Sequence, residues 1–226
     1  MTESLSAPIE QTIVDQMHIA AYSVVSRFYS RRNEVVLIHA RRFDGSSFDF
    51  VYKRYIAGQM ETEYRYLSRM QGVLGPLVLA KGTKALALEY IKGPLLIEKL
   101  EEAEKTGEPF HPYLDMLIDF LDRFYKVFPG CLYGDINLRN FIIAQNGLRG
   151  IDLELAGSGV IAADIGRTAA YLLTYEPAGT RYKKDIAQYF IRAGACRFGT
   201  SEGDIMTSMT MELDDMRKRR RLKKRH

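Results

Sequence analysis

The sequence has 226 residues, of which 46% are hydrophobic and 27% charged, which is typical of a globular chain with a sizeable core. No apolar run reaches the roughly 18 residues of a membrane-spanning helix, and the polar first sixteen residues lack the pattern of a secretory signal. Two cysteines outside any CxxC pattern and four scattered histidines argue against a disulfide framework or a zinc site. We therefore expect a cytoplasmic protein.

The net charge of +4 hides an uneven distribution. The last ten residues, 217–226, contain eight Lys or Arg, whereas the other 216 residues carry 24 Lys and Arg against 28 Asp and Glu, a net charge of −4. Blocks of like charge are usually disordered. The block is either a solvated tail or a contact for RNA, an anionic membrane or an acidic protein.

The first ninety residues read as strands with one helix among them. Residues 23–30, 34–43 and 48–55 are rich in β-branched and aromatic side chains and are separated by turn residues, which predicts an antiparallel meander. Residues 58–73 have helical spacing, with Met60, Tyr64, Leu67 and Met70 on one face. Residues 75–82 and 84–93 predict two further strands.

The character of the chain changes after residue 93. Residues 95–107 predict a helix, and residues 111–128 predict a second one with an apolar stripe. Two short strands, at 140–144 and 148–155, are joined by the turn QNG, and residues 162–189 read as helices. The stripe consists of Leu114, Leu117, Ile118, Leu121 and Phe124. The sequence thus predicts an α+β fold.

The stretch LYGDINLRNFII (132–143) carries the residues best suited to chemistry. Transfer of a phosphoryl group needs a cation on the phosphates, oxygen ligands for Mg²⁺ and a carboxylate near the attacking hydroxyl. Asp135 can accept the proton of a hydroxyl, and Asn140 can ligate a metal. A hairpin through the QNG turn would return Asp152 to Asn140, which predicts an Mg²⁺ site. Glu154 lies two residues on, on the same side of the expected strand, and either assists the metal or a neighbouring loop, or is merely structural.

YGDINLRN followed by GIDLE resembles the HGDxxxxN and IDxE motifs of the aminoglycoside phosphotransferase and choline kinase-like family. This resemblance, over residues 25 to 175, implies a two-lobed protein-kinase-like fold, with a β-rich lobe (1–91), a compact and mainly helical lobe (92–216) and the basic tail (217–226). It implies ATP and Mg²⁺ as cofactors. The implied positions are Lys53 on the phosphates, Glu63 as its partner with Glu61 competing, Ser30 and Asn33 in the phosphate loop, the hinge Glu89, Tyr90 and Ile91, and Asp164 as a brace of the catalytic loop.

The chain departs from the family pattern in two places. Tyr133 replaces the family's His before Gly-Asp, where a supporting role is expected. No GxGxxG covers the phosphates, so residues 30–34 would do so with backbone N–H groups. The Gly157-Ser-Gly159 segment follows the metal Asp and reads as a flexible connection, not a phosphate loop.

The acceptor is left open by the sequence. A small molecule with a hydroxyl group is expected, and Asp115, Asp119 and Asp122 either line a cleft for a polycation or form a solvated helix face. The compact second lobe is also similar to the lipopolysaccharide sugar kinases and to the small kinase of the tRNA-modifying KEOPS complex. A third reading is a non-catalytic pseudokinase that binds ATP.

Overall fold

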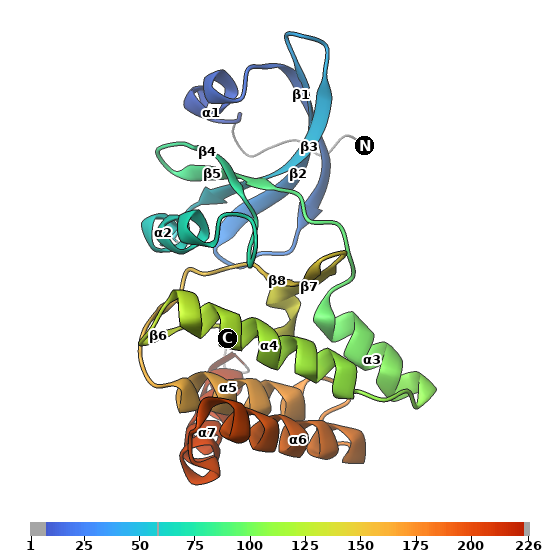
Figure 1. Ribbon diagram of the computed structural model, residues 1–226. Helices are drawn as coiled ribbons and strands as arrows, with labels where there is room; N and C mark the ends of the chain where they lie inside the picture. Colours follow the sequence, from blue (N-terminus) through green and yellow to red (C-terminus); the bar gives the residue numbers. More distant parts are fainter. Residues whose placement is uncertain (1–7, 58, 224–226) are drawn as a thin grey trace. The chain divides into compact units, whose positions relative to one another are not determined.

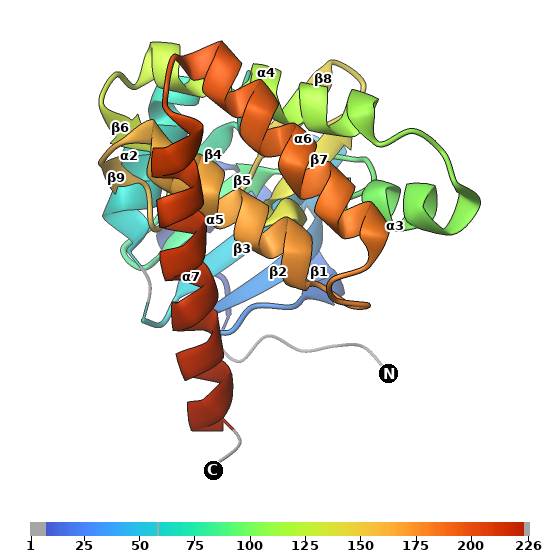
Figure 2. The ribbon, with the colours of Figure 1, turned by 90° about the horizontal axis from the view of Figure 1, so that it is seen from below.

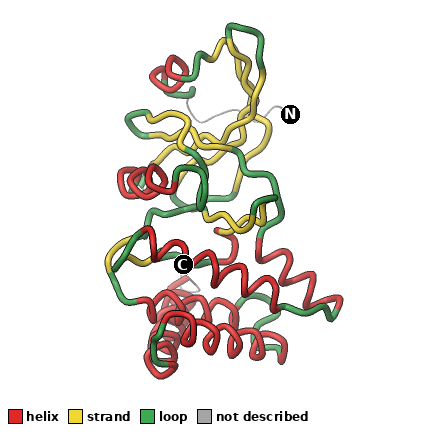
Figure 3. Tube along the Cα trace, viewed as in Figure 1, coloured by secondary structure: helices red, strands yellow, loops and turns green. Residues whose placement is uncertain are grey.

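The computed structural model describes residues 8–57 and 59–223, and in this range the chain divides into two compact units. The first unit combines the residues up to Lys92 with a separate segment, Gly150–Leu155. The second contains Gly93–Arg149 and the residues from Ala156 onward. Strands dominate the first unit and helices the second (Figure 3). The predicted α+β class is confirmed, whereas the predicted lobes placed residues 150–155 with the helices.

A five-stranded antiparallel sheet forms the first unit over its described residues, in the order β1–β2–β3–β5–β4 (Figure 1). Its strands are β1 (Ile19–Phe28), β2 (Asn33–Arg42), β3 (Ser47–Tyr55), β4 (Val78–Lys81) and β5 (Ala85–Glu89). The predicted meander and the two further strands are confirmed. β3 pairs with β2 and β5, and Lys53 in β3 lies opposite Val35 and Leu86.

Two helices belong to the described part of the first unit. The unpredicted α1 (Gln11–Gln16) packs Ile13 against the sheet residues Val36, Ile38 and Phe50. The predicted helix is α2 (Met60–Met70), which buries Met60, Leu67 and Met70 as expected but leaves Tyr64 half-buried. Glu63 and Tyr66 are buried instead. An acidic side chain therefore belongs to the buried face of α2.

Helices build most of the second unit. They are α3 (Leu96–Thr106), α4 (His111–Val127), α5 (Ile161–Thr174), α6 (Arg181–Phe198) and α7 (Glu202–Lys223). All five residues of the predicted apolar stripe on α4 are buried. α5 packs against both α6 and α7, and Figure 2 shows these three helices side by side. Lys183 of α6, fully buried, joins α3 through a 2.5 Å ion pair with Glu104.

Helix α7 was not predicted from the sequence, and its buried side carries Ile205 and Met216. A close contact with α5 holds it: a Cβ on Gly166 would lie 2.6 Å from the Ile205 carbonyl oxygen. The expectation of a disordered basic block is wrong for residues 217–223, which continue this helix, and residues 224–226 lie outside the described residues. Within the helix, Asp214 pairs with Arg217 and Asp215 with Lys218, so part of the positive charge is compensated.

Short strands connect the helices of the second unit. The predicted hairpin is confirmed as β7 (Phe141–Ala144) and β8 (Gly147–Gly150), preceded by the 3₁₀ turn η1 (Leu138–Asn140). β8 ends at Gly150, so the prediction of a strand through Asp152 and Glu154 is wrong. The predicted flexible connection at Gly157 is also wrong, because β9 (Gly157–Ser158) pairs with β6 (Cys131–Leu132).

Candidate functional site

Lys53 is the centre of a buried group of charged side chains in the first unit. Its position in the middle strand of the sheet leaves only 6% of the residue exposed. An ammonium group in such surroundings is stable only when anions and hydrogen-bond acceptors surround it. The protein supplies these acceptors from two other segments of the same unit.

Three carboxylates contact the Lys53 Nζ atom. Glu63 of α2 lies at 2.6 Å, Glu154 at 2.8 Å and Asp152 at 2.9 Å. The Tyr55 hydroxyl donates to the same Glu63 oxygen, Oε2, at 2.6 Å. Glu63 is therefore the acid of α2 that pairs with Lys53, whereas Glu61, its competitor in the sequence, pairs with Lys81. We call Lys53, Glu63, Asp152 and Glu154 the lysine–carboxylate cluster.

The backbone after β8 places Asp152 in the cluster. Asp152 has φ of 64°, in the left-handed region that few residues other than glycine adopt. This conformation ends the extended chain and explains why β8 stops before it. The side chain of Asp152 is 44% exposed, whereas Glu63 and Glu154 are buried. Asp152 is thus the member of the cluster that solvent or a ligand reaches.

Charge is unbalanced in the cluster. Burial alone would lower the pKa of the Lys53 ammonium, but the three carboxylates together raise it above its usual value. Burial raises the pKa of Glu63, and Asp152 adds to this rise while Lys53 opposes it. Three carboxylates therefore share one ammonium, and the excess is negative.

This donor set fits a hard divalent cation. One oxygen from each of Glu63, Asp152 and Glu154 lies within 4.8 Å of the others, and carboxylate oxygens are the ligands that Mg²⁺ prefers. The ammonium of Lys53 already occupies the space between them. A cation would therefore bind on the exposed side, at Asp152, where Mg²⁺ can keep several waters.

Glu154 also holds the turn between β1 and β2. Its Oε1 atom accepts a hydrogen bond from the Asn33 side chain, and the Asn33 Oδ1 atom accepts from the Ile56 N–H at 3.3 Å. The Ser30 Oγ atom accepts from the Asn33 N–H at 3.1 Å. Side-chain hydrogen bonds therefore fix the backbone of the expected phosphate loop, whereas a glycine-rich loop would be flexible. Asn33 itself belongs to β2.

The expected hinge lies at the end of β5. The Glu89 N–H donates to the Leu77 carbonyl at 2.8 Å, and the Glu89 carboxylate accepts from the Leu77 N–H at 3.0 Å. The backbone donor of Glu89 is thus engaged within the first unit. Tyr90 and Ile91 follow the strand, with Tyr90 half-buried and Ile91 buried.

In the second unit, Asp135 and Asn140 lie in one short loop. The Asn140 side-chain amide donates to the Asp135 carbonyl oxygen at 3.0 Å, and this bond does not use the amide oxygen, the atom that ligates metals. The Tyr171 hydroxyl approaches Asp135 Oδ1 at 3.4 Å. The loop thus presents a carboxylate and an amide at fixed positions.

Asp164 braces this loop from helix α5. Its carboxylate accepts hydrogen bonds from the N–H groups of Tyr133 and Gly134, at 2.7 and 3.1 Å, and from the Tyr125 hydroxyl at 3.0 Å. Burial raises the pKa of Asp164, while these hydrogen bonds lower it. Tyr133 is fully buried against the rings of Phe120, Phe124 and Phe141. Its ring therefore supports the loop by packing.

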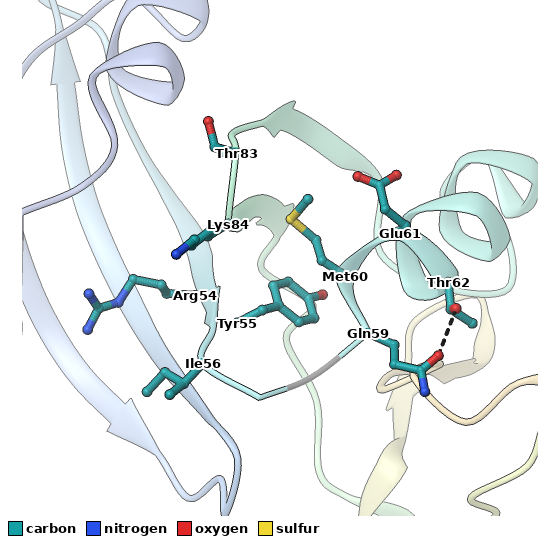
Figure 4. Close-up of a pocket in the computed structure, with 9 residues that line it drawn as sticks. All are labelled: Arg54, Tyr55, Ile56, Gln59, Met60, Glu61, Thr62, Thr83 and Lys84. Atoms are coloured by element: carbon teal, nitrogen blue, oxygen red, sulfur yellow. Dashed lines mark hydrogen bonds between the residues drawn. The ribbon is translucent and has the colours of Figure 1, made fainter.

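A hollow of about 710 Å³ lies elsewhere in the first unit, between the end of β3, the start of α2 and the turn between β4 and β5 (Figure 4). Arg54, Glu61 and Lys84 are among the residues that line it, and Lys53 and its carboxylates are not. We therefore base the candidate site on the lysine–carboxylate cluster.

Several residues of the site were not assigned from the sequence. Tyr55, Tyr171 and Arg167 carry no motif, and Arg167 donates to the Gly134 carbonyl at 3.1 Å. Glu154 was noted, but its bonds to Lys53 and Asn33 join segments that are about 100 or more residues apart. The one available signal was its spacing of two residues from Asp152.

A scan against protein-family models gives no match for this chain, and a search of curated proteins gives none either. Within the part of the chain that the structure describes, no helix has the length and apolar character to cross a membrane.

Proposed function

We propose that the chain is an ATP- and Mg²⁺-dependent phosphotransferase that moves the γ-phosphate of ATP to a hydroxyl group. The observation that carries the proposal is the buried Lys53, held at 2.6 Å by Glu63 of α2 and at 2.9 Å by the partly exposed Asp152. A buried lysine fixed by a helix carboxylate is a rigid cation for phosphate groups. The antiparallel sheet, the cluster and the largely helical second unit also support our inference of a protein-kinase-like fold.

The proposal assigns phosphate binding to the first unit. Lys53 would contact the phosphates, and Glu63 would hold its ammonium in place. Asp152 would hold Mg²⁺, which neutralises phosphate charge when bound. Both cysteines are free thiols, which supports the cytoplasmic location expected from the sequence.

Acceptor activation is assigned to Asp135 in the second unit. Its carboxylate would orient the hydroxyl and take up its proton as the oxygen bonds to the γ-phosphorus and the bond to the β-phosphate oxygen breaks, with ADP as the leaving group. The hydrogen bonds of Asp164 to the loop backbone support this role, because positioning carries most of such catalysis.

The substitution Asp135→Asn tests the proposal. We expect unchanged binding of Mg-ATP in a thermal-shift assay and a loss of at least about a hundredfold in phosphate transfer from labelled ATP, because proton acceptance contributes about 10² to 10⁴ in rate. The acceptor panel would contain sugars, aminoglycosides, amino alcohols and proteins. Asp204→Asn, on the exposed first turn of α7, is the matched control. Equal turnover in the two variants would refute the role of Asp135.

A non-catalytic ATP-binding scaffold is the second candidate. The observation in its favour is the 2.8 Å contact between Lys53 and Glu154, because this carboxylate competes with phosphate groups for the ammonium. Binding of Mg-ATP without turnover on the whole acceptor panel would select the scaffold. Turnover with any acceptor would exclude it.

A further inference from the structure

Two arginines of the second unit lie around the loop that carries Asp135. Arg167 of α5 donates from Nη1 to the carbonyl of Gly134, the residue before Asp135, at 3.1 Å. Its side chain is 40% exposed. A guanidinium has five N–H donors, so this bond leaves most of them for other partners.

Arg219 reaches the same neighbourhood from α7. Its Nη2 atom lies 2.5 Å from Glu212 Oε1, and Arg167 Nε lies 3.9 Å from the other oxygen of the same carboxylate. Glu212 is 12% exposed, whereas Arg219 is 56% exposed. One largely buried carboxylate therefore lies between two accessible guanidinium groups, and its two oxygens use only part of their N–H donors.

Tyr171 connects this pair to Asp135. Burial raises the pKa of the Tyr171 hydroxyl, and the charges of Asp135 and Glu212 raise it further, while Arg219 lowers it. All three charges thus act on one hydroxyl, which lies 3.4 Å from Asp135 Oδ1. The two guanidinium groups are therefore connected, through Arg167 at Gly134 and through Tyr171, to the loop of the carboxylate to which we assign the acceptor hydroxyl.

The acids that would suit a polycationic acceptor are already engaged. Asp119 and Asp122 of α4 pair with Arg197 of α6, and Asp115 accepts from the Tyr189 hydroxyl. Lys126 is a second cation at Asp122, so Asp119 and Asp122 are paired within the helical unit, whereas Asp115 keeps its charge behind a hydrogen bond. Two of the three acids suggested for a polycation cleft are thus engaged in ion pairs, whereas two exposed guanidinium groups lie in the network around the loop of Asp135.

We propose that the acceptor carries a phosphate or carboxylate group near its reactive hydroxyl, and that Arg167 and Arg219 bind this anionic group. Guanidinium groups suit the task because they donate two parallel hydrogen bonds to such oxygens. The proposal rests on the assignment of the acceptor hydroxyl to Asp135. It selects phosphorylated or carboxylated polyols and sugars over aminoglycosides as the acceptor class.

The first experiment compares glycerol 3-phosphate with glycerol, by calorimetric binding and by transfer from labelled ATP. We expect glycerol 3-phosphate to bind and react at least about tenfold better, and Arg219→Gln to remove most of this difference. Arg217→Gln is the matched control, because it removes one positive charge from the same helix. Arg217 pairs with Asp214 and not with Glu212, the partner of Arg219. Comparison of binding to phosphatidylglycerol vesicles and to phosphatidylcholine vesicles shows whether a lipid headgroup supplies the anionic group.

Equal losses in Arg219→Gln and Arg217→Gln would overturn the proposal, because they would indicate unspecific attraction to the basic helix. Equal binding of glycerol and glycerol 3-phosphate, or preferred transfer to kanamycin, would also overturn it. Failure of the proposed function would look different, as absence of transfer to every acceptor. In that case the binding difference between the two arginine variants still decides whether an anion site exists. Arg167→Gln, with a thermal unfolding control, provides a second variant at the site.

Discussion

Substitution of Lys53 by methionine tests the energetics of the lysine–carboxylate cluster directly. The change removes the ammonium and leaves Glu63 and Glu154 buried with their carboxylates close together. Asp152 contributes little to the penalty because water screens its exposed side chain. Removal of one partner from a buried ionic group destabilises a protein by about 3 to 5 kcal/mol. We therefore expect a loss of this size in the free energy of unfolding at pH 7.5, measured by urea denaturation and circular dichroism.

The same variant has a predictable pH dependence. The pKa of Glu63 is raised by burial above its usual value of 4.5, and loss of Lys53 removes the influence that opposes this rise. A carboxyl group with a raised pKa in the folded state favours folding when it is protonated, and this contribution is lost as the pH rises through that pKa. The destabilisation of Lys53→Met relative to wild type should therefore shrink between pH 8 and pH 5. Lys53 itself adds no pH dependence between pH 8 and pH 5, because its pKa is raised above its usual value of 10.5 and lies outside this range.

Lys84→Met is the control for this experiment, because Lys84 is an exposed lysine of the same unit. We expect an effect within about 0.5 kcal/mol there. The double variant Lys53→Met/Glu154→Gln should regain about 1 to 2 kcal/mol, since it removes one of the two buried charges. A loss below about 1 kcal/mol for Lys53→Met at pH 7.5, or a loss equal to that of Lys84→Met, would refute this account of the cluster.

Two further predictions concern the second unit. Gly166→Ala should destabilise the second unit by about 1 to 3 kcal/mol, because the new Cβ would lie 2.6 Å from both the Ile205 carbonyl oxygen and the Ser208 Cβ. Hydrogen exchange of the α7 amides would detect the change. Protection of these amides equal to that in the wild type would contradict the prediction. Lys183→Met should cost about 2 kcal/mol at neutral pH. Burial alone would raise the pKa of Glu104, but hydrogen bonds from Lys183 and Thr180 outweigh burial and lower that pKa. The stability that this pair contributes to the wild type is therefore present above pH 4.5 and lost at lower pH. An acid unfolding curve of the variant identical to that of the wild type would refute this prediction.

The regular elements with strong periodicity were predictable from the sequence. The apolar stripe from Leu114 to Phe124 and the β-branched and apolar run in β2 were sufficient to predict a helix and a strand, because each pattern depends on neighbours within one element. α7 was not predictable in this way. Its place depends on Gly166 of another helix, and its basic end is held by acids from Glu212 to Asp215, so the information lies in tertiary contacts.

The candidate site was predictable as a set of residues but not as an arrangement. The order of Lys53, Glu63 and Asp152 along the chain indicated which residues to examine. It could not indicate that Asp152 adopts a left-handed conformation, because the sequence there suggests an extended strand. Nor could it show that Glu154 contacts Lys53 and Asn33, because neither bond has a local signature.

The division of the chain has a consequence for how the protein can be cut. The first unit is made of two separate stretches, since Gly150–Leu155 joins it after an excursion through the second unit. A fragment that ends at Lys92 would keep Lys53 and Glu63 but lose both Asp152 and Glu154. Limited proteolysis near Lys92 therefore cannot release an intact half. Any exchange of this unit between related proteins, in the laboratory or in evolution, has to transfer two pieces of sequence together.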